Sequence, residues 1–277
     1  MSFNSINTNR QAVFALQFLN KTNSELGGVQ KRVSTGYRVA DARDDGGAYA
    51  VAQAVRSDVA GLTAVNEQLG GTKGVLQTTF ASLTVVSDTM QQARAALTRL
   101  ADGAISQSQR DQYNLQYNTL QAQISSFIDD SKYNGRTLLS TDTAAAAGGG
   151  DIIGIRNEDG GSFTVTAENG AILKIEAATY ANASAATAAL NGTFTSVEAN
   201  IASALNRFGA SMQYVENQIS FNSKKNDALN DGLGALVDAD LAKESSNLTA
   251  LQTRQQLGVQ TLSLANQGPQ VLLSLFR

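Results

Sequence analysis

Two long stretches of this 277-residue chain carry an apolar residue at every seventh position. In the first half these positions hold Leu62, Leu69, Leu76, Leu83, Met90 and Leu97. In the second half they begin with Phe194, Ile201, Phe208 and Val215. Seven residues make about two helical turns, so the repeat gathers apolar side chains in one stripe along each helix. We therefore predict two long helices that form a rod, with these residues as its core.

Three further segments carry shorter apolar stripes. Between residues 113 and 127 the apolar residues are spaced alternately by four and three, which predicts a third helix that begins after a break at Asp102-Gly103. The stripe near the N-terminus holds Leu19, Leu26 and Val33. The stripe near the C-terminus holds Leu241, Leu248, Leu251 and Leu262. Both ends have the pattern of amphipathic helices that need partners.

The middle of the chain has a different pattern. An Ala- and Gly-rich tract ends at Gly150, and short alternating apolar runs follow between residues 153 and 175, separated by turn residues at 158–161 and 168–170. This pattern predicts one or two β-hairpins. A further turn is predicted at Asn134-Gly135. The predicted fold class is mainly α, a long coiled-coil helical hairpin with a small central β-hairpin insert.

Composition excludes several classes of function. The chain has no Cys, His or Trp, so it lacks thiolate and imidazole metal ligands and the common nucleophilic dyads. We expect no enzymatic activity, no cofactor and no metal. The net charge of −3 lacks the basic surplus that nucleic-acid binding requires, and no apolar stretch is long enough for a membrane-spanning helix. The first ten residues lack the basic and apolar segments of a secretory signal peptide, so we expect export by another route.

The terminal stripes predict a polymer. Ordering one residue costs about 1–2 kcal/mol, and burying one leucine-sized side chain returns about 1.5–3 kcal/mol. Terminal helices with one large apolar residue every three or four positions do not offset that cost alone. We expect the termini to order fully only against neighbouring copies, and contacts that do not close into a ring produce a helical filament. The predicted polymerisation interface comprises Leu19, Leu26, Val33, Leu241, Leu248, Leu251, Leu262 and Leu272.

Several motifs at both ends resemble those of bacterial flagellins. The N-terminal signature is represented by residues 5–9 (SINTN), 32–39 (RVSTGYRV) and 42–48 (ARDDGGA). Residues 132–139 (KYNGRTLL) resemble the turn that follows the second helix of the family's core. The C-terminal signature is represented by residues 238–245 (DADLAKES) and 265–272 (ANQGPQVL). The resemblance covers about residues 1–140 and 193–277.

The resemblance implies a secreted, extracellular filament subunit that transmits motor torque for swimming. Residues 1–40 and 236–277 would form the inner coiled-coil tube, called D0, and residues 41–140 and 193–235 the helical rod, called D1. A spoke near residues 36–50, with Arg38, Arg43, Asp44 and Asp45, would link the two, and residues 141–192 would form a short variable β insert. The implied partners are copies of the same chain, other flagellin paralogues, an export chaperone of the flagellar type III apparatus, the filament cap and the hook-filament junction protein.

Alternative interpretations remain for three features. Asp44-Asp45 is an adjacent carboxylate pair that could suit a divalent cation, but a solvated turn, or pairing with Arg32, Arg38 and Arg43, fits a chain without histidine better. The C-terminal run that includes Leu272 is too short for a membrane-surface segment and fits a subunit interface better. For the whole chain, the alternative to a filament subunit is a hook-filament junction protein or another secreted coiled-coil accessory protein that does not polymerise.

Overall fold

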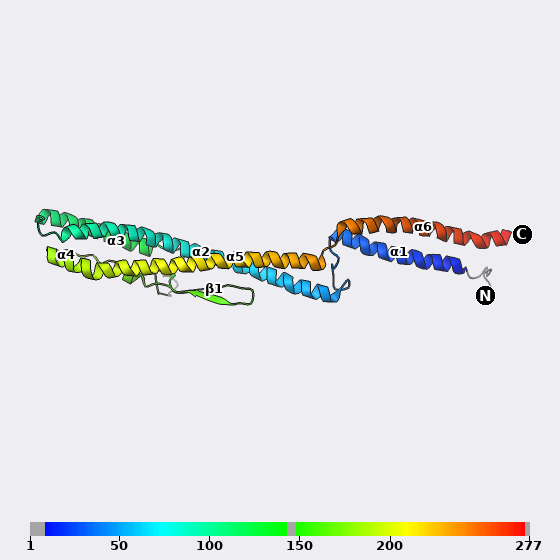
Figure 1. The fold of residues 1–277 in the computed structure, drawn as a ribbon, viewed down its shortest axis with the longest axis horizontal. Coiled ribbons are helices and arrows are strands. Elements are labelled where there is room, and N and C mark those ends of the chain that lie inside the picture. Colours follow the sequence, from blue (N-terminus) through cyan, green and yellow to red (C-terminus); the bar gives the residue numbers. More distant parts are fainter. Residues whose placement is uncertain (1–8, 143–147, 275–277) are drawn as a thin grey trace. The chain divides into compact units, whose positions relative to one another are not determined.

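The structure is a computed structural model that describes residues 9–142 and 148–274, with side chains described up to residue 267. Its elements follow in chain order as α1 (Arg10–Thr35), α2 (Gly46–Leu100), α3 (Gln107–Asp129), β1 (Ile152–Ile155), β2 (Ser162–Val165), the 3-10 helix η1 (Gly170–Leu173), α4 (Ala183–Ala189), the π-helical turn η2 (Leu190–Phe194), α5 (Thr195–Val237) and α6 (Leu241–Ser274) (Figure 1). The predicted fold class is confirmed, since long helices dominate and β1 and β2 form a two-stranded antiparallel sheet.

The chain divides into two compact units. The central unit comprises Asp58–Asp227, and the terminal unit comprises Met1–Ser57 with Ala228–Arg277. The boundary falls within α2 and within α5, so each of these helices contributes residues to both units. None of the described helices is both long and apolar enough to cross a membrane.

The central unit is built around one continuous apolar core. It buries side chains of α2, α3 and α5, which run alongside one another in Figure 1. Each of the ten residues that the seven-residue spacing placed in the core, from Leu62 to Val215, is at most 3% exposed. The core also takes in Val165, Leu173 and Ile175 of the middle segment. The segment predicted as an insert therefore packs as part of the central unit.

The break between α2 and α3 is stabilised by polar contacts. The buried Arg110 guanidinium donates to the carbonyl oxygens of Leu100 (2.6 Å) and Asp102 (3.1 Å). These are carbonyls at and just beyond the end of α2, which have no intrahelical partner. At the start of α3, Ser106 and Gln109 form a reciprocal capping box. The turn predicted at Asp102-Gly103 thus separates two well-capped helix ends.

The middle segment forms one β-hairpin. Strand β1 pairs with β2 in the register Ile152 to Val165 and Ile155 to Ser162. The hairpin rests on α5, where the amides of Gln218 and Asn222 both donate to the Arg156 carbonyl at 3.0 Å. The turn at Asn134-Gly135 is also present, with φ of 49° and 75° and paired backbone hydrogen bonds between the flanking residues, as in a type I′ turn.

The second hairpin, predicted as an option around residues 168–170, does not form. Asn169 instead caps the 3-10 helix η1, because its side chain accepts a hydrogen bond from the Ala171 N–H. Gly170 packs so closely on the Leu139 carbonyl that an added Cβ would clash with that oxygen. Leu173 and Ile175 then enter the common core. Packing against the helices, rather than strand pairing, decides the conformation of this stretch.

Candidate functional site

The terminal unit consists mainly of α1 and α6, which lie side by side (Figure 1). Polar contacts fix their antiparallel register at three levels. Arg32 donates to Glu244 (3.1 Å), the Gln255 amide donates to Asn23 (2.8 Å), and the Asn9 amide donates to the Ala265 carbonyl (2.7 Å). Asp240 caps the start of α6 by accepting from the N–H groups of residues 242 and 243. The pair is therefore aligned along its described length.

The apolar seam between α1 and α6 is thin. Its buried residues are Leu26, Val29 and Leu251, which remain 4–8% exposed, and Val33 and Leu248 pack partly buried against them. A two-helix pair covers each seam residue from one side only, so its burial stays shallow. The seam holds the two helices together but forms no core comparable to that of the central unit.

Most of the predicted polymerisation residues lie in or beside this seam. Leu26 and Leu251 are buried within the chain, because α1 and α6 pack their seven-residue stripes on each other; their contact with another copy stays a prediction. Leu19 packs beside Gly258, where an added Cβ would lie 3.2 Å from its side chain. Leu262 is half-buried, and Leu241 is 50% exposed. The side chain of Leu272 lies outside the described residues.

A second set of apolar side chains lies outside the seam and is exposed. On α1 it comprises Val13, Phe14, Leu16 and Phe18, which are 47–69% exposed. On α6 it comprises Leu257, Val259 and Leu264, which are 54–71% exposed. We call these seven residues the outer apolar face. The seven-residue spacing did not predict this face, because the spacing selects only the residues of the seam. The apolar residues outside the stripe were nevertheless visible in the sequence.

Charged residues are scarce over the parts of α1 and α6 that carry this face. Residues 11–20 carry no charge, and residues 245–274 carry only Arg254. A solvated helix face normally carries many charges, whereas the centres of protein interfaces are depleted of them. The exposed apolar side chains and the sparse charge therefore coincide on these two stretches.

The segment after α1 is hydrogen-bonded to the end of α5 and to the residues that follow it. Gly36 ends α1 in the left-handed conformation (φ 75°), and its carbonyl accepts from the Ala239 N–H (2.9 Å). The backbone N–H and the guanidinium of Arg38 donate to the carbonyls of Val237 (2.7 Å) and Leu236 (2.6 Å), respectively. Val39 is buried beside Ala52 and Val237 in a small cluster of its own. Residues 36–39 are therefore tied to the chain far away in sequence.

An exposed ionic cluster stabilises residues 40–45. Lys31 donates to Asp44 at 2.6 Å and to Asp41 at 2.9 Å, and Arg43 donates to Asp41 at 3.0 Å. The Asp44 carboxylate also accepts from the N–H groups of Ala40 and Asp41. Asp45 accepts from the Ala48 N–H at the start of α2. The two adjacent carboxylates thus have separate structural roles.

These contacts shift the protonation of the cluster. Hydrogen bonds from Arg43 and then Lys31 hold the pKa of Asp41 well below its ordinary range. The hydrogen bond from Lys31, followed by that from the Asp41 N–H, lowers the pKa of Asp44. The same bonds, to Asp44 first and Asp41 second, raise the pKa of Lys31. All three groups are therefore held in their charged forms.

The partners of Asp44 and Asp45 differ from the arginines that the sequence led us to expect. Arg32 binds Glu244, Arg38 binds a backbone carbonyl, and Arg43 binds Asp41. Lys31, which the sequence reasoning overlooked, is the partner of Asp44 because it lies one turn before the end of α1 and faces the loop. Within residues 9–142 and 148–274, no group of three or more acidic side chains could hold a metal ion.

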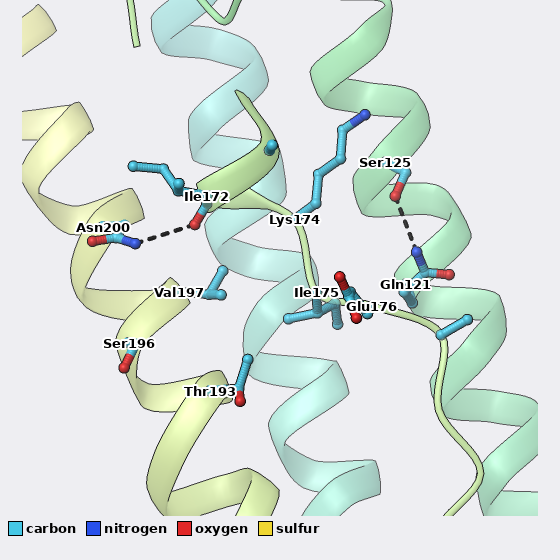
Figure 2. A pocket seen from close by; sticks show the side chains of 12 residues that line it. Gln121, Ser125, Ile172, Lys174, Ile175, Glu176, Thr193, Ser196, Val197 and Asn200 are labelled. Atoms are coloured by element: carbon cyan, nitrogen blue, oxygen red, sulfur yellow. Dashed lines mark hydrogen bonds between the residues drawn. The ribbon is translucent and has the colours of Figure 1, made fainter. Parts of the chain in front are cut away.

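The central unit has an open groove of about 530 Å³ beside η1 (Figure 2). Its polar walls are largely engaged within the chain. Asn200 donates to the Ile172 carbonyl (3.2 Å), Gln121 donates to Ser125 (3.1 Å), and Lys174 binds Asp129 (2.6 Å). These groups do not converge on the open space, so the groove lacks the features of a small-molecule site.

Comparison with known proteins agrees with this geometry. Residues 6–144 match the bacterial flagellin N-terminal helical region, and residues 193–276 match the bacterial flagellin C-terminal helical region. Flagellin FljK of Caulobacter vibrioides is 34% identical over 100% of both chains, and a flagellin of Brucella melitensis is 33% identical over 99% of both chains. The crystal structure of Bacillus cereus flagellin shares the fold with a TM-score of 0.50 at 19% identity, covering 56% of this chain and 88% of that one. This chain belongs to the bacterial flagellin family and is a structural subunit of the flagellar filament, through which the family serves motility.

Proposed function

We propose that the terminal unit is the polymerisation element of this flagellin and forms the inner tube of the filament. The observation that carries the proposal is the outer apolar face, seven large side chains exposed within residues 11–20 and 245–274, stretches that carry one charge between them, Arg254. Exposed apolar clusters of this kind mark protein contact sites. Copies stacked along a helical path would cover this face on every subunit.

In the same proposal the central unit is the outer rod, and residues 36–50 are the spoke. The rod needs no neighbour to fold, because its helices bury a complete core within one chain. The spoke gains its order from backbone hydrogen bonds and from the cluster around Lys31. A filament assembled this way would transmit motor torque through its packed rods and tube.

The proposal extends to the route and partners of the subunit. A chain with an exposed apolar face on its terminal helices requires protection before assembly, which is the task of a cytoplasmic export chaperone. Export through the flagellar type III apparatus, growth beneath a filament cap and attachment to the hook-filament junction protein complete the path to an extracellular filament. Several flagellins of Caulobacter vibrioides are similar to this chain over their whole length, and we propose that paralogous flagellins share its filament.

Seeded elongation tests the polymerisation role. Heat-dissociated monomer is added to short sonicated filaments at neutral pH, and filament length is followed by negative-stain electron microscopy. We expect steady elongation from the seed ends. A folded, helical monomer that leaves the seeds unchanged would refute the proposal and favour the accessory role of a non-polymerising coiled-coil protein.

A further inference from the structure

The apolar stripe of α5 is interrupted within the central unit. Seven residues after Val215 the stripe position holds Asn222, which is fully buried. Lys73 of α2 binds Glu216 of α5 (3.0 Å), and the two helices run in opposite directions, so Asn66 of α2 lies at about the same level as Asn222 (Figure 1). The Asn66 Oδ1 atom is also buried. A buried amide costs stability unless it is hydrogen-bonded, so this part of the seam needs polar partners.

The tip of the β-hairpin, residues 156–161, supplies such partners. The buried Asn222 amide donates to the Arg156 carbonyl at 3.0 Å. About one turn further along α5, the Lys225 ammonium donates to the Glu158 carboxylate. Contacts of this kind satisfy polar groups that would otherwise be buried without partners. The tip is thus joined to α5 by polar contacts.

The Glu158 carboxylate depends on Lys225. Its side chain is only 10% exposed, whereas that of Lys225 is 36% exposed. Glu158 Oε1 accepts from Lys225, and Oε2 is buried with no hydrogen-bond partner among the described residues. The hydrogen bond lowers the pKa of Glu158 and raises the pKa of Lys225, on which the nearby Asp159 of the tip and Asp58 of α2 also act. Loss of Lys225 would therefore leave a buried carboxylate without its counter-charge.

A glycine lets the tip approach α2 as well. A Cβ added at Gly61 would lie 3.1 Å from the Cβ of Glu158, closer than an ordinary van der Waals contact. Glycine inside a helix costs about 0.5–1 kcal/mol relative to alanine, but here it leaves the room that Glu158 occupies. At Gly71 of the same helix, an added Cβ would meet no atom within 4 Å. The tip therefore contacts both helices, α2 at Gly61 and α5 at Asn222 and Lys225.

The base of the hairpin is held in a different way. Val165 belongs to the core of the central unit, and Ile152 and Ile155 pack against that core. The Phe163 ring packs on Tyr214 of α5, with the ring centroids 5.3 Å apart. These apolar contacts do not involve the tip. The polar contacts of the tip are therefore separable from the contacts that anchor the hairpin.

We propose that residues 156–161 are a strap that holds α2 and α5 together across the polar part of their seam, and that Glu158 and Lys225 fasten it. The strap is a third covering element for two helices whose own contact is polar at this level. Releasing it would loosen residues 58–66 of α2 and 218–227 of α5, which we call the strapped segments, while the rest of the core stays packed. The rod would then have one stretch that loosens without loss of its core. The strap acts within one chain and does not depend on polymerisation.

Amide exchange of the monomer, read by mass spectrometry, tests the fastening. Lys225→Met leaves the Glu158 carboxylate buried and unpaired, so exchange in the strapped segments should become more than about tenfold faster. Exchange over residues 76–97 of α2 should stay within about threefold of the unmodified chain. Lys224→Met, at the exposed neighbouring position, is the matched control and should change neither region. Unchanged exchange in the Lys225 variant would overturn the strap, and so would equal acceleration over the whole central unit.

A second substitution separates the ion pair from general destabilisation. Glu158→Gln removes the buried charge and leaves Lys225 partly exposed to water, so it should accelerate exchange less than Lys225→Met does. Adding Glu158→Gln to Lys225→Met should slow exchange back toward that of Glu158→Gln alone, because no buried charge remains. A double variant whose acceleration is the product of the two single effects would contradict the pair as the fastening.

A steric substitution tests the docking of the tip without changing any charge. Gly61→Val places a side chain where Glu158 lies, so it should detach the tip and accelerate exchange in residues 218–227 of α5, which carry no substitution. Gly71→Val, where an added Cβ meets no atom within 4 Å, is the matched control and should leave that exchange unchanged. Far-UV circular dichroism checks that each variant is folded. A folded Gly61 variant with unchanged exchange in α5 would show that the tip does not strap the two helices.

Discussion

The central and terminal units use the same seven-residue stripe and reach different depths of burial. In the central unit the stripe residues are at most 3% exposed, because three helices and the middle segment cover them. In the terminal unit Leu26 and Leu251 stay 7% and 8% exposed, and Val33 and Leu248 are only partly buried. The stripe determines that a helix has an apolar side, whereas the number of covering elements determines how much that side stabilises. The terminal unit lacks covering elements that other copies can supply.

Both units expose apolar side chains and carry ion pairs, but the packing beneath them differs. The outer apolar face lies within residues 11–20 and 245–274, which carry one charge, Arg254. The central unit also exposes large apolar side chains, such as Leu115 and Ile153, and carries ion pairs such as Arg94 with Glu198. Its core is buried within one chain, whereas the terminal seam is thin, so we expect assembly to cover the terminal helices.

The largest expected effect comes from a charge in the central core. Leu83→Asp places an unpaired carboxylate at a fully buried position and should lower the stability of the central unit by about 3–5 kcal/mol. Thermal unfolding followed by circular dichroism measures the loss. Val85→Asp, at a 45% exposed position of the same helix, is the matched control and should change stability by less than about 1 kcal/mol. Equal losses of stability in the two variants would show that burial at Leu83 does not stabilise the central unit.

A charge on the outer apolar face should act on assembly instead. Phe18→Asp changes a side chain that is 69% exposed, so monomer stability should hardly change. In the filament it forfeits burial of about 1.5–3 kcal/mol, which corresponds to a rise of about 10- to 100-fold in the critical concentration for elongation. Leu115→Asp, on α3 and 70% exposed, controls for adding the same charge. A critical concentration for the Phe18 variant equal to that of the unmodified chain would show that this part of α1 is not in the interface.

A smaller effect is expected from helix propensity. An added Cβ meets no atom within 4 Å at Gly27 in α1 or at Gly71 in α2. Alanine at either site should therefore stabilise its helix by about 0.5–1 kcal/mol. Gly27→Ala should slow amide exchange in α1 of the monomer by a few fold, whereas Gly71→Ala should act within α2 alone. A Gly27 variant that is stabilised as monomer but assembles poorly would show that a neighbouring copy packs against this glycine.

The smallest effect concerns the exposed ionic cluster of residues 40–45, in the proposed spoke. The pKa values of Asp41 and Asp44 are lowered in the folded chain, so their contribution is present above the unfolded value of about 3.9 and is lost as the pH falls through the folded values. Carboxyl ¹³C titration by NMR should give lower midpoints in the protein than in a peptide of residues 36–45. Lys31→Met should bring the Asp44 midpoint toward that of the peptide. Equal midpoints in protein and peptide would contradict the ion pairing of Asp41 and Asp44 in the folded chain.

Sequence reasoning predicted the features that depend on local pattern. The long helices and their core residues from Leu62 to Val215 follow from the spacing, and the turns at Asn134-Gly135 and Asp102-Gly103 follow from residue type. It failed where a distant contact decides the outcome. The stretch at Gly170 became a 3-10 helix because it packs on Leu139, and Asp44 bound Lys31 rather than the nearer arginines. The outer apolar face escaped notice because only the structure shows which side of α1 the seam leaves exposed.

Hydrogen exchange of monomer and filament, read by mass spectrometry, tests the central claim most directly. Amide protection follows the free energy of local opening. We predict strong protection of α2, α3 and α5 within the central unit in both states. For α1 and α6 we predict weak protection in the monomer and strong protection in the filament. Terminal helices protected as strongly in the dilute monomer as the central core would contradict the account, because the terminal unit would then be complete without its neighbours.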